Sequence, residues 1–492
     1  MPIYPRPAWA LCALLAGCTL GPDQPPGSTV PLPVSRLEMH AEQGLDQWWQ
    51  LYRDPDLNAA VQEALSQNRD LRMAAANLLQ ARALLRETDT LRQPATQVTA
   101  QASYGSTADD QLEAALQDSE RIRTGSRYGV GLDVQWEADL FGRLHGLANA
   151  ARADAEAARA AEDGLRVVVA AETTRAWLQA CSYGQRLQVA GESLALVEQG
   201  RALSAQLYQA GAAVTLDVVR AEGLVGQVQA SLPPLQAGRQ RALAELAVLL
   251  GRPPGDAPAV AKACHQAPRL GSPMPQSDAL AMLRRRPDVS QAERRLAAAT
   301  ARIGVARADL YPRVSLGAGV YTSAHQPSGF DERDASVWQL GPLLSWSLPN
   351  LNAARARIAQ ADARESAALA DFDRSILAAL KEQQQALSDY QAALQRQEAL
   401  HLAAERDHQA LHLAGLARAA GASSALDYLD AQRSAVRTRA AAVQADAAVI
   451  DTQVLVFKAL GGGWRSAPPI VLPPPNRAAA NPFLRTSDEP VP

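Results

Sequence analysis

The sequence predicts a mainly α-helical fold that also carries membrane β-strands, and three observations predict it. Gly211-Ala212 recurs as Gly421-Ala422 at an offset of 210 residues, and the same offset relates Trp136 to Trp346. Each copy holds two runs that alternate between apolar and polar residues, and each copy ends in a far longer run of helix formers. A repeat of this kind is a structural unit that needs its neighbours to complete a core. We therefore expect an internal duplication.

The N-terminus is typical of a bacterial lipoprotein. Arg6 precedes a short apolar stretch that ends in Leu15-Ala16-Gly17-Cys18. A charged start, a short apolar core and small residues before the cleavage site indicate a signal peptide. The final string resembles the lipobox, which implies removal of residues 1–17 and attachment of S-diacylglycerol and N-palmitoyl groups to Cys18. The alternative is an ordinary signal peptide that is cleaved elsewhere.

The residues after the cleavage site indicate an outer-membrane address. Thr19 follows the lipobox cysteine at the position where Asp would favour retention at the inner membrane. Residues 18–43 are rich in proline, a composition that predicts an extended linker between the lipid anchor and the folded protein. The first structural repeat is expected to follow over 44–270, and the second over 271–464.

Two strands are predicted in each repeat. In the first repeat they cover about 95–105 and 127–138, and in the second about 312–322 and 336–348. Apolar residues alternate with polar or small ones at the strand period of two. The apolar set comprises Val98, Ala100, Ala102, Tyr104, Tyr128, Val130, Leu132, Val134, Trp136, Val314, Leu316, Ala318, Val320, Trp338, Leu340, Leu344, Trp346 and Leu348. The intervening segments, about 106–125 and 325–335, are expected to be solvated loops facing the exterior.

These runs match strands that cross a bilayer, which need about 9 to 11 tilted residues, apolar toward lipid and polar toward a lumen. Half-buried strands of a soluble sandwich would alternate in the same way. Four strands do not close a membrane barrel, however, and an open sheet edge is not viable in lipid. Several chains must therefore close the barrel together.

Each repeat then continues into a very long helical hairpin, over about 143–251 and 353–462. The outgoing runs lack proline and are crowded with Ala, Leu, Arg, Glu and Gln, which are strong helix formers. About 68 helical residues span roughly 100 Å. Gly211 and Gly421 supply the left-handed conformation that ends a helix. Helical sequence resumes about four residues later, so each hairpin is expected to have a tight tip.

The composition agrees with an envelope protein. The chain is 47% hydrophobic and 20% charged with a net charge of -3, so it is neither disordered nor basic enough to indicate nucleic-acid binding. No run of 18 apolar residues follows the N-terminus, which argues against ordinary transmembrane helices. The sequence contains no Gly-x-Ser-x-Gly elbow, zinc-protease motif or Walker motif, so we expect neither an enzyme nor a bound cofactor.

The cysteines and histidines give weaker signals. Besides Cys12 and Cys18, the chain holds Cys181 on a predicted long helix and Cys264 between the repeats. The periplasm permits a disulfide, but these positions favour two separate thiols. His401, Glu405, His408 and His412 share one helical face, an arrangement that can ligate zinc or copper. A solvated polar face is the simpler interpretation, and no metal site is predicted.

One segment identifies a family. Arg285-Arg286-Pro287-Asp288-Val289, with its continuation Ala292-Glu293, resembles the TolC-like outer membrane efflux proteins, in the NodT-type lipoprotein branch that serves resistance-nodulation-division pumps. Further matches are Tyr311-Pro312, Ala420-Gly421 and the run Leu426–Ala431. The resemblance extends from about Trp48 to Trp464. Asn68-Arg69-Asp70-Leu71 is its weaker echo in the first repeat.

The resemblance implies a homotrimer in the outer membrane of a Gram-negative bacterium. Three chains of four strands would form a 12-stranded β-barrel, and their hairpins would form a helical barrel in the periplasm. The hairpin tips, at Gly211, Ala212, Gly421 and Ala422, would face a periplasmic adaptor (membrane fusion) protein and the inner-membrane pump. The function implied is passive conduction of drugs or other small molecules to the exterior, with substrate choice made by the pump.

A constriction near the tips is implied as well. Asp427 and Asp430 resemble the family's acidic ring and stand three residues apart on one helical face. In a trimer they would place six carboxylates around the lumen, which favours cations and opposes anions. The alternative is two solvated acids that favour the helix dipole. The first repeat retains Asp217 but has Arg220 in place of the second acid, so Asp217 is the weaker candidate.

Two other functions remain open from the sequence. One is a channel for type I protein secretion, and the other is a structural lipoprotein that uses its helices as a spacer across the envelope. The lipobox and the Arg-Pro-Asp-Val segment favour a pump partner over the first, and the four strands argue against the second. Residues 465–492 are rich in proline near their start and are expected to form a disordered or extended tail.

Overall fold

The computed structural model describes residues 21–22, 24–31, 46–106, 108–122, 124–271, 274, 279–324, 326, 328, 330, 336–346 and 351–472. The signal peptide, Cys18, most of the linker, residues 347–348 of the fourth predicted strand and the tail beyond 472 lie outside these residues. The described part forms two compact units. One contains residues up to Thr29 with Leu79–Ala158 and Gln291–Asp373, and the other contains Val30–Leu78, Arg159–Ser290 and Arg374 onward.

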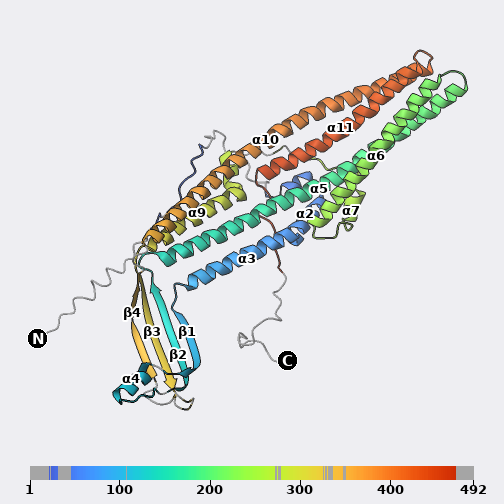
Figure 1. The fold of residues 1–492 in the computed structure, drawn as a ribbon. Helices are drawn as coiled ribbons and strands as arrows, with labels where there is room; N and C mark the ends of the chain where they lie inside the picture. The colour runs from blue at the N-terminus through green and yellow to red at the C-terminus, as the bar shows by residue number, and fades with distance from the viewer. Residues whose placement is uncertain are drawn as a thin grey trace. The chain divides into compact units, whose positions relative to one another are not determined.

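The first unit carries a four-stranded antiparallel sheet (Figure 1). Its strands are β1 (Ala95–Gly105), β2 (Gly125–Ala138), β3 (Arg313–Ala324) and β4 (Ser336–Ser345), and they neighbour one another in chain order. The four predicted strands are therefore confirmed. Within the described residues β1 and β4 each pair with a single strand, so each leaves one edge unpaired.

The register aligns the predicted faces across all four strands. Val98 lies opposite Leu132, Leu132 opposite Val320, and Val320 opposite Trp338. In the adjacent row, Gln97 lies opposite Asp133, Asp133 opposite Gly319, and Gly319 opposite Gln339. Side chains of consecutive residues point to opposite faces of a sheet, so one face is an apolar belt and the other is polar or small. The apolar side chains are largely exposed in the single chain, Trp338 to 76%.

Two glycines on the polar face make room for an aromatic ring. A Cβ atom built on Gly129 would lie 2.2 Å from the hydroxyl of Tyr321, and one on Gly131 would lie 3.1 Å from the same ring. The Tyr321 hydroxyl accepts a hydrogen bond from Nε2 of Gln101 at 2.6 Å. The Gly-Val-Gly run in β2 therefore lets a tyrosine lie flat across the polar face.

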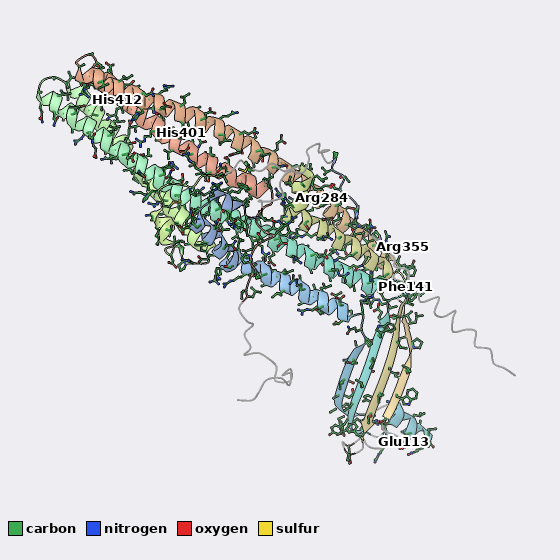
Figure 2. The ribbon with its side chains drawn as sticks, turned by 180° about the vertical axis from the view of Figure 1, so that it is seen from behind. Glu113, Phe141, Arg284, Arg355, His401 and His412 are labelled. Carbon is green, nitrogen blue, oxygen red and sulfur yellow. A yellow bond between two sulfur atoms is a disulfide. The ribbon has the colours of Figure 1, made fainter. Side chains whose placement is uncertain are left out.

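The loop between β1 and β2 differs from the expectation of a solvated loop. It contains a helix, α4 (Ala108–Leu116), at the end of the sheet farthest from the start of α5 (Figure 2, where Glu113 lies on α4 and Phe141 just precedes α5). Ala114 is 8% exposed and the Asp110 carboxylate binds Arg127 of β2. The ion pair ties this helix to β2, at a residue 17 positions away in sequence.

Two helical hairpins follow the strand pairs (Figure 1). The first consists of α5 (Arg143–Gln209) and α6 (Thr215–Leu249), and the second of α10 (Leu351–Ala419) and α11 (Ala425–Ala459). The prediction of two very long hairpins is confirmed. Helix α6 continues through Pro233 and Pro234, so the return helix of the first hairpin holds the helix-breaking residue that the outgoing runs lack.

Both hairpin tips use the same glycine cap. Gly211 has a φ of +72° and Gly421 a φ of +75°. The next amide, of Ala212 or Ala422, donates to the carbonyl five residues earlier at 2.8 Å in each case. This is the Schellman pattern, in which a left-handed residue satisfies the last carbonyls of a helix. The duplication therefore preserves the conformation of the turn as well as its sequence.

Shorter helices complete the two repeats. The first repeat begins with a 3-10 turn (Trp48–Tyr52), α2 (Pro55–Gln67) and α3 (Arg69–Thr90), and the connection between repeats holds α7 (Ala259–Ala263). The second repeat begins with α8 (Ala279–Arg285) and α9 (Pro287–Ala308). Asn68 starts α3 by accepting hydrogen bonds from the amides of Asp70 and Leu71.

The family segment forms a polar junction in the second unit. Arg286 is 7% exposed. It lies between α8 and α9, at the position that Asn68 occupies between α2 and α3 in the first repeat. Its guanidinium donates to both oxygens of Asp288 at 3.0 and 2.7 Å, to Glu382 of α10 at 2.7 Å and to the carbonyl of Ala459 at 3.0 Å. One arginine thus joins the start of α9 to α10 and to the end of α11.

One helix is apolar enough to span a membrane by length and composition. Residues Leu426–Ala459 of α11 include a window with a mean hydropathy of 1.3, and half of that window is buried inside the protein. Phe457, near its end, is fully buried and stacks on Trp48 with ring centroids 4.5 Å apart. Packing against the chain's own core accounts for the apolar character, as in a core helix.

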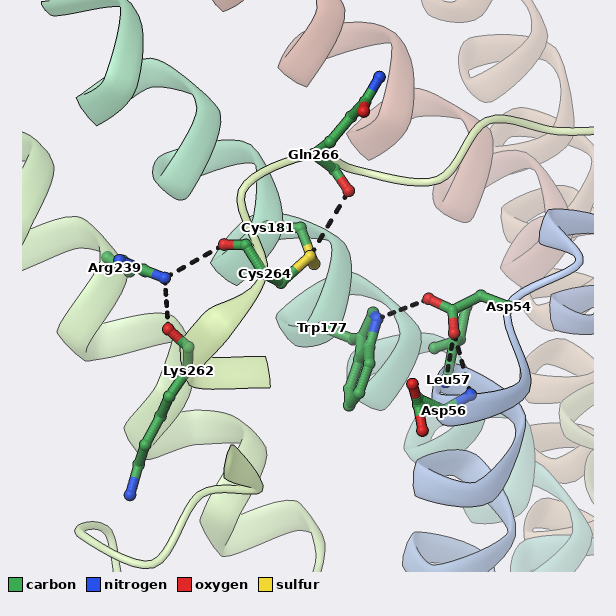
Figure 3. Close-up of a disulfide and its surroundings, with 9 residues drawn as sticks. All are labelled: Asp54, Asp56, Leu57, Trp177, Cys181, Arg239, Lys262, Cys264 and Gln266. Atoms are coloured by element: carbon green, nitrogen blue, oxygen red, sulfur yellow. Dashed lines mark hydrogen bonds between the residues drawn. A yellow bond between two sulfur atoms is a disulfide. The ribbon is translucent and has the colours of Figure 1, made fainter. Parts of the chain in front are cut away.

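The expectation of two separate thiols is wrong, because Cys181 of α5 and Cys264 form a disulfide (Figure 3). Their Cα atoms lie 4.8 Å apart although 83 residues separate them. Helix α6 runs back along α5, and Gly238 packs on Tyr183. Arg239 then donates to the carbonyls of Lys262 and Cys264 at 2.6 and 3.1 Å. The hairpin returns the chain to the turn of α5 that holds Cys181.

Candidate channel constriction

The candidate constriction begins where α11 starts, four residues after the glycine of the second tip. The side chain of Ser424 accepts a hydrogen bond from the amide of Asp427 at 3.1 Å. The Asp427 carboxylate in turn accepts from the Ser424 hydroxyl at 2.8 Å and from the Ser424 amide at 2.9 Å. This reciprocal arrangement is a capping box, which satisfies two donors of the first helical turn.

The cap also affects ionisation. Hydrogen bonds from the Ser424 hydroxyl and amide lower the pKa of Asp427 below its ordinary value of 3.8. Both hydrogen bonds stabilise the charged form. Asp427 therefore holds a full negative charge at neutral and mildly acidic pH. The carboxylate is fully exposed, so solvent screens its effect on stability.

Asp430 lies nearly one turn further along the same helix and is exposed, as is Asp427. The opposite side of α11 is buried through Leu429 and Gln432. The Gln432 amide donates to the carbonyl of Leu196 in α5 at 2.9 Å, and Gly200 leaves the room for it. Because that contact sets the rotation of α11, both carboxylates point away from the packed side of the hairpin.

The first repeat reproduces only part of this geometry. Asp217 accepts a longer hydrogen bond, 3.4 Å, from the amide of Val214. Valine has no side-chain acceptor, so the reciprocal bond of the capping box has no equivalent. Arg220 occupies the place of Asp430. The first hairpin therefore supplies one acid beside a basic residue, and the second supplies two acids.

A cation and an aromatic ring flank the second tip, and the sequence did not predict their contact. The guanidinium carbon of Arg418 lies 5.0 Å from the centre of the Tyr428 ring. Its two terminal nitrogens are buried and have no hydrogen-bond partner among the described residues. Arg418 thus faces the ring of Tyr428, next to Asp427. The signal in the sequence is the placement of both residues within ten positions across Gly421.

The tip residues themselves are exposed. Gly211, Ala212, Gly421 and Ala422 all lie at the surface, and a Cβ atom on either glycine would meet nothing within 4 Å. Close packing therefore does not require glycine at either tip. The positive φ angles do require it, because side chains with a Cβ atom rarely adopt that conformation.

His401 lies on the helical face that also carries Glu405, His408 and His412, and it contacts a carboxylate of the neighbouring helix. Nε2 of His401 lies 2.7 Å from the Asp446 carboxylate, which also accepts a hydrogen bond from Gln397 at 2.7 Å. Figure 2 shows His401 and His412 along the second hairpin. Across the part of the chain that the structure describes, no three His, Cys, Asp or Glu side chains lie together as a metal site would need.

Comparisons with known proteins agree with this architecture. The family described as "Outer membrane efflux protein" matches residues 60–252 and 280–462. Outer membrane protein OprJ of Pseudomonas aeruginosa is 32% identical over 474 residues, covering 93% of this chain and 97% of that protein. Nodulation protein T of Rhizobium leguminosarum bv. trifolii is 28% identical over 470 residues, covering 94% of this chain and 97% of that protein. The solved structure of the outer-membrane channel OprN superposes with a TM-score of 0.82 at 35% identity. The match covers 91% of this chain and 100% of that one.

Proposed function

This chain belongs to the outer membrane efflux protein family, and from that membership we propose how its own residues build and close a channel. The protein is an outer membrane channel, the exit duct of a tripartite efflux system that passes drugs or other small molecules to the exterior of a Gram-negative cell. Proteins of this family work as trimers with a periplasmic adaptor and an inner-membrane pump.

The observation that carries the proposal for this chain is the sheet. Its apolar rows cross all four strands on one face, and β1 and β4 each leave an edge unpaired within the described residues. A sheet in lipid must close on itself because unpaired backbone groups are too costly there. Three copies of this chain supply twelve strands, with β1 of one copy beside β4 of the next.

The long hairpins supply the periplasmic part of the duct. At 1.5 Å per residue the 67 residues of α5 and the 69 residues of α10 correspond to roughly 100 Å each. The exposed tips at Gly211, Ala212, Gly421 and Ala422 are the surface we assign to the adaptor. Energy comes from a resistance-nodulation-division pump in the inner membrane, and this chain conducts passively.

The closing device is assigned to the acidic pair. Three copies of Asp427 and Asp430 place six carboxylates around the lumen near the tips, and Asp217 adds a weaker contribution from the first hairpin. A ring of carboxylates favours cations and opposes anions in a narrow pore. The capping box on Asp427 favours the ionised form that such a ring needs.

The anchor is assigned to Cys18. Its acyl groups would hold the N-terminus in the inner leaflet of the outer membrane, and the described part of the linker lies on the first unit. Ser28 and Thr29 donate hydrogen bonds to Asp373 of α10 at 2.6 and 2.5 Å. A Cβ atom on Gly21 would lie 2.8 Å from Gly304 of α9. These contacts fasten the described part of the linker to α9 and α10.

Two measurements test the channel and its partner surface. The purified protein should run as a trimer by native mass spectrometry and give stepwise ion currents in planar bilayers. Ala212→Glu with Ala422→Glu should keep those currents but abolish drug resistance in cells that supply the adaptor and pump. Ala410→Glu, on an exposed position of α10 before the tip, is the matched control. A monomer without currents would overturn the channel, and unchanged resistance would overturn the tip assignment.

A further inference from the structure

An ion pair ties helix α4 to the polar face of the sheet. Asp110, which is 5% exposed, binds the guanidinium of Arg127 at 2.5 Å. Arg127 pairs with Ser103 of β1 and shares its strand face with Gly129 and Asp133. That is the polar face, opposite the apolar belt formed by residues such as Leu132 and Trp338. In the proposed barrel that face lines the lumen, so the ion pair holds α4 on the lumen side.

The other side of α4 is apolar and uncovered. Leu112 is 59% exposed and Leu116 is 80% exposed, whereas Ala114 is 8% exposed. Successive helical residues are about 100° apart, so Asp110 and Ala114 share one face while Leu112 and Leu116 share the opposite one. Because Asp110 ties the opposite face to Arg127 of β2, the leucine face points away from the sheet.

We propose that the leucine faces of α4 from three copies of this chain meet at the outer mouth and form an apolar constriction there. The inference rests on the trimeric barrel of the proposed function, which arranges the three helices around one axis. Lipid is the wrong occupant, because the anchor of α4 lies on the lumen face. Each of the other two copies presents the same leucines at the same height, and apolar faces exclude water when they meet.

Such a constriction would act differently from the acidic ring. An apolar narrowing blocks ions by expelling water and does not select by charge. Its position at the end of the sheet farthest from the starts of α5 and α10 places it at the cell surface (Figure 1). The duct would then have one closure at each end, a charged one at the hairpin tips and an apolar one at the barrel mouth.

Cysteine cross-linking tests the contact between copies. The native Cys181 and Cys264 are already joined, so an introduced cysteine is readily followed. Leu112→Cys trimers treated with copper phenanthroline should yield covalent dimers on non-reducing gels. Gln111→Cys is the matched control, since it is also exposed but lies about 100° around the helix from Leu112. Equal dimer yield in both variants, or none in either, would overturn the contact.

Access from outside the cell tests the closure. A cysteine at Gln135, on the polar face of β2, should react slowly with a large maleimide-polyethylene glycol added to intact cells. Leu112→Asn with Leu116→Asn should raise the labelling rate several-fold, and Asp110→Ala should do the same by releasing the helix. Unchanged rates in both variants would overturn the constriction. Native mass spectrometry of the unmodified protein distinguishes failure of this inference from failure of the proposed function. Absence of a trimer there would contradict the proposed function itself.

Discussion

At the scale of single residues, the two acids beside the second tip differ in what holds them. Asp427 takes part in a capping box with Ser424, and Asp430 is exposed without such a partner in the described structure. One residue therefore combines a structural role with its charge, and the other offers charge alone. The two roles separate under substitution.

We expect Asp430→Asn to weaken cation selectivity and leave the unfolding temperature unchanged. Asp427→Asn should weaken selectivity to a similar extent and also lower the unfolding temperature, because the amide is a poorer acceptor for the Ser424 donors. Reversal potentials in a salt gradient and thermal unfolding in detergent measure the two effects. An unchanged reversal potential in the variant that combines Asp427→Asn with Asp430→Asn would refute the proposed ring of carboxylates.

The pH dependence of the Asp427 cap has a definite sign. Its pKa is lowered in the folded protein by the hydrogen bonds from Ser424. The contribution of the cap to stability is therefore complete above the ordinary pKa near 3.8 and is lost as pH falls through the depressed value. Thermal unfolding of the wild-type protein and of Asp427→Asn should converge as the pH is lowered below that point. A difference that stays constant down to pH 2 would contradict the assignment.

Arg286 carries the largest predicted single-residue effect on stability. Arg286→Ala removes hydrogen bonds to Asp288, Glu382 and Ala459 from a buried position. The expected loss is about 3 kcal/mol, at the low end for breaking a buried charged network because both carboxylates are half-exposed. Arg286→Lys should retain part of the stability, since it keeps the charge but not the paired geometry. Equal losses in both variants would show that packing, and not the guanidinium, matters there.

At the scale of elements, the disulfide joins the connection between the repeats to α5. Cross-linking positions 83 residues apart restricts the unfolded chain strongly. Cys181→Ser with Cys264→Ser should therefore cost about 2 to 4 kcal/mol of stability. The wild-type protein treated with a reductant should lose a similar amount. Thermal unfolding that is unaffected by both treatments would exclude a stabilising disulfide.

The strands show how one residue of register decides a side chain's environment. Leu340 lies on the apolar face and Gln339 on the polar one. We expect Leu340→Arg to hinder insertion of the barrel, since arginine at the middle of the bilayer costs about 2 to 4 kcal/mol on a lipid-facing strand. Gln339→Arg, its neighbour, should insert normally. The yield of outer-membrane trimer in fractionated cells compares the two, and equal yields would contradict the assignment of the faces.

At the scale of the whole molecule, we expect lipid anchoring and trimer formation to be separate requirements. The contacts of Gly21, Ser28 and Thr29 hold the linker on the folded protein independently of its acyl groups. Cys18→Ser removes the proposed acylated thiol and should abolish incorporation of labelled palmitate. It should also reduce delivery to the outer membrane, while trimers that do arrive retain channel currents. Undiminished labelling in Cys18→Ser would contradict the lipidation site.

Much of the fold follows from local signals. Strand alternation placed β1 to β4, and the glycines at 211 and 421 placed both hairpin tips, because each depends on residues within a few positions of one another. The attachment of α4 to the sheet could not be predicted in this way, because Arg127 is distant in sequence from Asp110. The contact of Arg418 with Tyr428 was missed for the same reason, since it forms only after the chain reverses at Gly421.

The sequence by itself determined the duplication, the two faces of the sheet and the long hairpins, all of which are periodic or repeated patterns. Tertiary structure alone decided that Cys181 and Cys264 join, that the linker binds Asp373 and that Asp110 of α4 pairs with Arg127 of β2. The physical reason is that these contacts join segments brought together by the hairpins and by strand pairing. Sequence periodicity reports which face a residue occupies, and packing reports which partner it meets.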